Sequence, residues 1–152
     1  MEAGEKFPDF VPQDANGETF DSKTLKGKRY VIYFYPKDNT SGCTREAVSF
    51  SENKEAFEDL GIQIIGVSKD SVASHKKFVD SKDLKIKLLS DPEHKLLEAS
   101  GAWGTKIMYG KETAGTIRST FIVGPDGKVE AAWKKVKVDG HVEKVLEKAK
   151  SL

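Results

Sequence analysis

Residues 30–67 of the chain read YVIYFYPKDNTSGCTREAVSFSENKEAFEDLGIQIIGV, and the pattern of this segment indicates the fold class. Its first six residues form an unbroken apolar and aromatic run, which is typical of a strand buried on both faces of a sheet. Residues 41–60 are expected to form an amphipathic helix, because apolar side chains recur there at helical spacing: Ala47, Phe50, Phe57 and Leu60. Gly61 ends this helix, and residues 62–67 predict a second buried strand. The order is therefore strand, helix, strand, which indicates an α/β domain.

The segments on either side complete this domain. The dipeptide Asn16-Gly17 predicts a tight turn and an N-terminal β-hairpin. After residue 67 we expect a helix over 71–80, a short strand at 88–89 and a helix that has Asp91 as its N-cap and ends at Ala99. A strand over 119–123, a turn at 125–127 and a returning strand over 128–133 should follow, and a helix around 142–149 closes the chain. Residues 104–115 have no periodicity and are expected to form a mobile surface loop. The pattern predicts a single domain over 1–152, with a mixed central sheet flanked by helices.

Composition excludes several classes of function. The chain has 152 residues, and 25 Lys and Arg against 24 Asp and Glu give a formal net charge of +1. This balance supplies no field that would gather nucleic acid or an anionic membrane, so we expect neither partner. No apolar run approaches the roughly 18 residues of a spanning helix. Residues 1–6 are acidic and polar, unlike a secretory signal, and a cytoplasmic protein is expected.

The histidines do not suggest a metal site. His75, His94 and His141 are scattered along the chain, and none is paired at the spacing of metal ligands. Solvated surface imidazoles are the expected role for all three. We therefore predict that the protein binds no metal.

Cys43 is the single cysteine, so it cannot form an internal disulfide or a cysteine-rich metal site. It follows the turn formed by residues 36–42 and lies in the first turn of the predicted helix. Unpaired backbone N–H groups and the positive end of the helix dipole meet there, and they favour the nucleophilic thiolate. An inert core thiol is the alternative, because free cysteines are commonly buried.

Arg118 is the second candidate residue. Only three of the 25 cationic residues are arginines, and Arg118 directly precedes a predicted apolar strand. Its planar, permanently charged fork could stabilise a thiolate and hold an oxygen anion. An ordinary salt bridge at a strand end is the alternative.

Residues 36–43, PKDNTSGC, resemble the Pro-x-x-x-Thr-x-x-Cys active-site motif of peroxiredoxins. More narrowly, residues 35–46 resemble the bacterioferritin comigratory protein or peroxiredoxin Q subfamily, as do three later segments: Trp103-Gly104, Met108-Tyr109-Gly110-Lys111 and Ile117-Arg118-Ser119-Thr120-Phe121. This resemblance implies a thioredoxin-like fold. It also implies a thiol-dependent peroxidase that reduces hydrogen peroxide and organic hydroperoxides without a metal, haem or flavin cofactor.

The resemblance also implies a role for each motif residue. Cys43 would be the peroxidatic cysteine, whose thiolate attacks the peroxide and becomes a sulfenic acid. Thr40 would hydrogen-bond the thiolate and the peroxide, and Arg118 would stabilise both. Pro36 would shield the pocket from water, and the backbone N–H groups of Gly42 and Cys43 would bind a peroxide oxygen.

One position departs from the subfamily. Many members carry a resolving cysteine five residues after the peroxidatic one, and this chain has Val48 there and no other cysteine. The chain is thus similar to one-cysteine members, in which an external reductant resolves the sulfenic acid: a small thiol, a thioredoxin-like or glutaredoxin-like protein, or a second subunit. The subfamily resemblance favours a monomer or weak homodimer. Two alternatives stay open: a redox sensor or relay that passes a disulfide to a client protein, and a thioredoxin-fold binding module or holdase that does not use Cys43.

Overall fold

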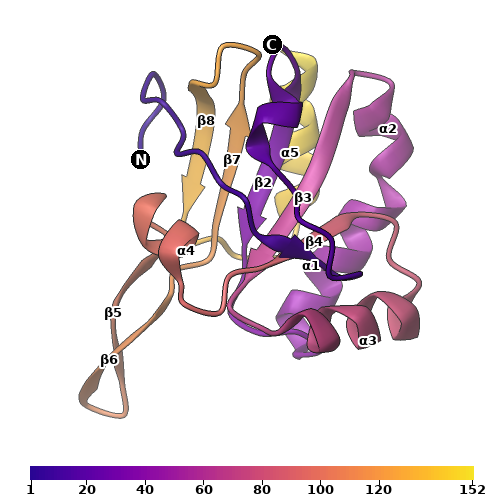
Figure 1. Ribbon diagram of the computed structural model, residues 1–152. Helices are drawn as coiled ribbons and strands as arrows, with labels where there is room; N and C mark the ends of the chain where they lie inside the picture. The colour runs from indigo at the N-terminus through magenta and orange to yellow at the C-terminus, as the bar shows by residue number, and fades with distance from the viewer.

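The computed structural model of the protein describes residues 1–152, with the side chains of Lys106 and Met108 outside the described part (Figure 1). A six-stranded mixed sheet forms its centre. In spatial order its strands are β1 (Gln13–Asp14), β4 (Lys87–Ser90), β3 (Ile62–Ser68), β2 (Arg29–Phe34), β7 (Ser119–Val123) and β8 (Val129–Lys134). The contacts of β3 with β2 and with β4 are parallel, and the other pairings are antiparallel. The predicted α/β domain with a mixed sheet is confirmed.

Helices cover both faces of the sheet. They are α1 (Ser41–Glu52), α2 (Lys54–Glu58), α3 (Val72–Lys82), α4 (Lys95–Ala99) and α5 (His141–Lys150), together with a 3-10 turn at Ser22–Leu25. Residues of α1, α2, α3 and α5 pack into one core, while α4 and the N-terminal segment pack into the other. None of the helices in the described part of the chain has the length and hydropathy needed to cross a bilayer.

Strand β2 supplies side chains to both cores. Successive residues of a strand point to opposite faces, so Val31 and Tyr33 enter one core, while Ile32 and Phe34 enter the other. All four are fully buried. Burial on both faces is the reason why the sequence shows a continuous apolar run here instead of alternation.

The predicted continuous helix over 41–60 is interrupted at Asn53. Helix α1 ends at Glu52, and α2 begins at Lys54. The Asn53 side-chain amide donates to the Ser49 carbonyl oxygen at 2.8 Å. An asparagine amide that bonds to nearby backbone competes with regular helical bonding, which accounts for the break.

The loop predicted over 104–115 is wrong. Strands β5 (Trp103–Met108) and β6 (Lys111–Thr116) pair there as an antiparallel hairpin that projects from the body of the protein (Figure 1). Tyr109 and Gly110 both have positive φ, as the tightest hairpin turns require. Four of the six residues of β6 are exposed, so the hairpin shows no apolar alternation in the sequence. Backbone pairing between the two strands therefore accounts for this hairpin.

The predicted N-terminal hairpin is present. The Asp14 N–H donates to the Glu18 carbonyl oxygen and the Phe20 N–H to the Pro12 carbonyl oxygen, Gln13 forms an antiparallel bridge with Thr19, and β1 also pairs with β4. One predicted helix start differs. Helix α4 begins at Lys95, four residues after the predicted N-cap Asp91. The left-handed conformation of His94 ends the preceding turn, and a carboxylate oxygen of Asp91 instead accepts from the Leu97 N–H at 2.8 Å.

Two of the three histidines are buried, which contradicts the predicted surface positions. His75 is 0% exposed and His141 is 3% exposed, whereas the His94 side chain is partly exposed as expected. Nε2 of His141 lies 2.8 Å from the Thr120 hydroxyl. Burial, followed by the charges of Lys144 and Arg118, lowers the pKa of His141 to about 4. Partners from distant elements keep both rings inside, and their sequence neighbours give no sign of this.

Gly66 is required by packing in the centre of the sheet. A Cβ atom there would lie 2.8 Å from Leu88 Cδ2 and from Tyr33 Cζ. Because both neighbours are buried, we predict that Gly66→Ala lowers the free energy of unfolding by about 1–3 kcal/mol, measured by urea denaturation.

Gly104→Ala is the matched control. A Cβ atom there would approach the Ile117 Cδ1 methyl at 2.7 Å, and this flexible end can move aside. Its loss of stability should be clearly smaller. Equal losses for the two variants would contradict the assignment of Gly66 to a rigid contact.

Candidate active site

The site lies where the carboxyl end of β2 meets the beginning of β7, two central strands of the sheet. These strands are antiparallel, and Phe34 pairs with Ser119. The loop that follows Phe34 and the residue that precedes Ser119 are therefore neighbours. That loop leads into α1 and Cys43, and the preceding residue is Arg118, so the pairing brings together two residues that are 75 positions apart.

Cys43 lies in the first turn of α1 and is 1% exposed. The first N–H groups of an α-helix have no acceptor within the helix. Thr40 is the N-cap, but its side chain makes no capping bond. The Cys43 sulfur thus lies beside the positive end of the helix dipole, which favours a negative charge.

Arg118 contacts Cys43 directly. Its Nη2 donates to the Cys43 sulfur at 3.3 Å, and its Nη1 donates to Glu46 Oε1 at 2.6 Å. The Arg118 side chain is only 16% exposed. A guanidinium cation held this close, with little water around it, stabilises a thiolate more than a thiol.

Glu46 is a site residue that was not predicted from the sequence. It is completely buried, and its Oε2 has no hydrogen-bond partner among the residues that the structure describes. Burial raises the pKa of Glu46 to about 7, although the charge and hydrogen bond of Arg118 act in the opposite direction. Glu46 lies three residues after Cys43, one helical turn on, so that spacing could have indicated a shared face. Nothing local shows that a charged residue there is buried.

The other predicted residues surround this centre. The Thr40 hydroxyl donates to the Lys37 carbonyl oxygen at 2.8 Å and makes no hydrogen bond to Cys43. Pro36 is partly buried at the start of the loop. Gly42 lies against Arg118, because a Cβ atom there would be 3.5 Å from Nη2. The structure thus brings Gly42, Cys43 and Arg118 together and places Pro36 and Thr40 in the adjoining loop.

Val48 is partly buried and packs against the same core that contains Cys43. A valine at this position makes apolar contacts and has no redox chemistry. The candidate site therefore contains one thiol, one guanidinium and one buried carboxyl group.

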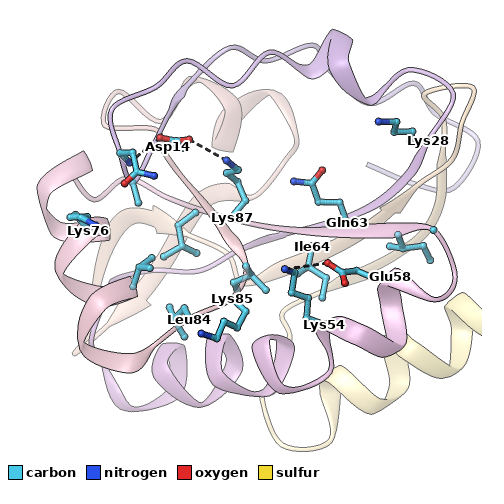
Figure 2. A pocket seen from close by; sticks show the side chains of 17 residues that line it. Asp14, Lys28, Lys54, Glu58, Gln63, Ile64, Lys76, Leu84, Lys85 and Lys87 are labelled. Atoms are coloured by element: carbon cyan, nitrogen blue, oxygen red, sulfur yellow. Dashed lines mark hydrogen bonds and ion pairs between the residues drawn. The ribbon is translucent and has the colours of Figure 1, made fainter.

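A cavity of about 560 Å³ lies elsewhere, between the start of β3 and the segment that leads into β4 (Figure 2). Neither Cys43 nor Arg118 lines it. Five lysines do, but four of them are paired with carboxylates: Lys54 with Glu58, Lys76 with Asp80, Lys85 with Asp83 and Lys87 with Asp14. Because these charges are compensated, the cavity is not assigned as an anion site.

Asp38, Asp70 and His75 place potential metal-ligand atoms within 4.8 Å of one another. Their atoms are already engaged in hydrogen bonds. The two ring nitrogens of His75 contact Asp38 Oδ2 and the Leu89 carbonyl oxygen, and Asp70 Oδ2 accepts from the Asp38 N–H. We therefore interpret this group as a hydrogen-bond network.

Known proteins of one family are similar to this chain. Residues 3–132 match the model of the AhpC/TSA family. The chain is 45% identical over 152 residues to peroxiredoxin Bcp of Bacillus subtilis, covering 100% of this chain and 97% of that protein.

Solved structures are similar over nearly their whole length. Peroxiredoxin Q of Xanthomonas campestris superposes with a TM-score of 0.93 at 39% identity, covering 99% of this chain and 98% of that one. A ligand complex of the bacterioferritin comigratory protein of the same organism, described for its alkyl peroxide reduction activity, also has a TM-score of 0.93, at 38% identity, with the same coverage of both chains.

The raised pKa of Glu46 predicts a specific pH dependence of stability. A carboxyl group that holds its proton more tightly when folded contributes stability that is lost as pH rises from 4.5, its ordinary pKa, to about 7. Glu46→Gln cannot titrate. The stability of the wild type relative to this variant should therefore decrease across that interval, measured by urea denaturation at several pH values.

Glu58→Gln changes an exposed carboxylate that pairs with Lys54 and serves as the control. Its stability relative to the wild type should show a smaller pH dependence. The predicted protonation of Glu46 would be contradicted if the free energy of unfolding of the wild type, relative to that of Glu46→Gln, stayed constant or increased as the pH rises.

Proposed function

The chain belongs to the AhpC/TSA family, within its Bcp and peroxiredoxin Q members, and on this premise we propose that it reduces peroxides through a sulfenic acid on Cys43. It is a peroxiredoxin, an enzyme of the peroxidase class. The observation that carries the proposed mechanism is the 3.3 Å contact of Arg118 Nη2 with the Cys43 sulfur at the start of α1.

In the first step the Cys43 thiolate attacks the nearer oxygen of a hydroperoxide. The S–O bond forms as the O–O bond breaks, and the departing oxygen takes a proton and leaves as water or an alcohol. Sulfur is oxidised by two electrons, and the peroxide is reduced by two. Arg118 stabilises the attacking thiolate and the negative charge that develops on the departing oxygen.

Three further residues support this step in our proposal. The backbone N–H groups of Gly42 and Cys43 bind the peroxide oxygen, because they face outward from the first turn of α1 without an intrahelical acceptor. Thr40 turns its hydroxyl from Lys37 toward the thiolate and the peroxide when substrate binds. Pro36 limits the access of water to the sulfur.

The second step uses an external thiol, because Cys43 is the one cysteine of the chain. A first thiol condenses with the sulfenic acid, forming a mixed disulfide and releasing water. A second thiol reduces this disulfide, restores Cys43 and leaves as part of an external disulfide. A small thiol or a thioredoxin-like or glutaredoxin-like protein can supply both. This dependence suits a reducing compartment such as the cytoplasm.

Hydrogen peroxide and organic hydroperoxides are the proposed substrates. The alkyl peroxide reduction described for the similar protein of Xanthomonas campestris supports the second class. No metal, haem or flavin takes part in the proposed chemistry. We propose a monomer or weak homodimer, since neither step needs a residue from a second copy.

Replacing the thiol should abolish the activity. Cys43→Ser should leave the fold intact and remove peroxide consumption, measured with a thiol donor in excess. Peroxide consumption that Cys43→Ser leaves unchanged would show that the assignment is wrong.

Arg118→Lys should slow the reaction of Cys43 with peroxide by about 100-fold, because a single ammonium group cannot hold the sulfur and Glu46 together as the planar fork does. Stopped-flow measurement of thiol loss tests this. Arg45→Lys is the matched control, because Arg45 is an exposed residue of α1 that pairs with Asp139 on the surface. Similar rates for both variants would contradict the proposed role of Arg118.

The one-cysteine mechanism predicts a distinct oxidised product. One equivalent of peroxide should add a single oxygen atom to Cys43, detected by mass spectrometry and by dimedone trapping, and a panel of thiol donors should reduce it with turnover. A stable mixed disulfide with one client protein and no turnover would favour a redox relay instead.

A further inference from the structure

We propose that Asp38 and His75 form a positioning pair, which ties the loop before α1 to α3 and so controls how readily an external thiol reaches Cys43. This inference rests on the proposed function and deepens it. It concerns the opening of the site that must precede the second step. Neither residue belongs to the reacting centre, so both act through the loop.

Asp38 is the point at which this loop is attached to the rest of the protein. Its backbone N–H donates to Asp70 Oδ2 at 2.8 Å. Its carboxylate accepts from the Tyr35 hydroxyl at 2.6 Å and from the Ser74 hydroxyl at 2.8 Å, and it lies 2.7 Å from His75 Nδ1. The Asp38 side chain is therefore bonded to two residues of α3.

Within the loop of residues 36–40, as the structure describes it, the hydrogen bonds to other parts of the protein are those of Asp38. The Thr40 hydroxyl bonds to Lys37, which lies within the same loop. Asn39 has a φ of 62°, a conformation that a non-glycine residue adopts at some cost. The loop is thus a strained segment that is fastened mainly at one residue.

His75 is completely buried and faces a hydrogen-bond acceptor at each ring nitrogen. Nδ1 faces the Asp38 carboxylate, and Nε2 lies 2.9 Å from the Leu89 carbonyl oxygen. An N–H on Nδ1 that donates to the buried Asp38 carboxylate at 2.7 Å forms a charge-assisted hydrogen bond, which is strong in the absence of water.

The hydrogen bonds around Asp38 also stabilise its carboxylate form. Burial alone raises the pKa of Asp38, but hydrogen bonds from His75, Tyr35 and Ser74 outweigh burial and leave that pKa below its ordinary value. The carboxylate is therefore the form that the network holds.

The Asp38–His75 pair affects the accessibility of Cys43 through the short segment of chain that joins Asp38 to Cys43. Cys43 lies five residues after Asp38, in the first turn of α1, and is 1% exposed. A peroxide is small enough to enter such a site, but a thiol reductant, especially a protein, needs the sulfur at the surface. The start of α1 must then move outward, and the bonds of Asp38 oppose that movement.

Asp38→Asn tests the proposal with two rates that should move in opposite directions. Alkylation of reduced Cys43 by a bulky maleimide should become about tenfold faster, since the charge-assisted hydrogen bond of the Asp38 carboxylate is lost and the loop opens more often. The reaction with hydrogen peroxide should become about tenfold slower, since the sulfur is held less firmly beside Arg118. Circular dichroism confirms that the variant is folded.

Asp80→Asn is the control on the same helix. Asp80 is exposed on α3 and pairs with Lys76, so both rates should match the wild type. A purely structural role of Asp38 would lower the melting temperature without separating the two rates. Unchanged rates in folded Asp38→Asn, or rates that move in the same direction, would overturn the proposal.

His75 provides a second pair of variants. The amide of His75→Asn can place an N–H near the position of Nδ1, whereas His75→Leu cannot donate. Alkylation should therefore be slower in His75→Asn than in His75→Leu, and equal rates would overturn the role of the donor. Alkylation needs no peroxidase activity, so it tests the pair even if the wild type fails to consume peroxide, a result that would defeat only the proposed function.

Discussion

The antiparallel pairing of β2 with β7 fixes the geometry on which the site depends. It places the end of one buried strand beside the start of another, so that Cys43 and Arg118 meet although they are distant in the sequence. Both strands lie in the middle of the sheet with cores on either face. A rigid centre of this kind allows the Cys43 sulfur to be placed on a helix start after a loop without losing its position relative to the guanidinium.

Charges beside the Cys43 sulfur are buried at a cost. Glu46 is completely enclosed, one of its oxygens has no partner in the described part of the chain, and its hydrogen bond with Arg118 must offset the loss of water from both groups. A core of apolar residues would serve stability at least as well. The arrangement is understandable if Glu46 holds Arg118 in place, leaving the other amino group of the fork free to face the sulfur. Stability and reactivity thus make different demands on the same residues.

The sequence predicts features that depend on local pattern. The apolar run before the turn, the amphipathic spacing after it and the rarity of arginine were sufficient to select Cys43 and Arg118 as candidates. Burial of His75, His141 and Glu46 could not be predicted in this way, because their partners come from distant elements. The β5–β6 hairpin was missed for a related reason: backbone pairing accounts for it, and its mostly exposed second strand leaves no apolar alternation. The break at Asn53 depends on one side-chain bond within a helix whose apolar spacing continues beyond it.

The lone cysteine has a consequence for how the protein behaves over time. In a protein with two partner thiols, the oxidised cysteine forms an internal disulfide, and this comparatively inert disulfide is the form that persists until a reductant arrives. In the mechanism proposed for this chain both electrons arrive from outside, so the oxidised fraction at any moment reflects two independent supplies, peroxide and reductant. In that mechanism the sulfenic acid persists when reductant is scarce, and a second peroxide can oxidise it to the sulfinic acid, which ordinary thiols do not reverse. The burial of Cys43, which is 1% exposed, admits small peroxides but slows repair by an external thiol, and so lengthens the time in which a second peroxide can react in the proposed mechanism.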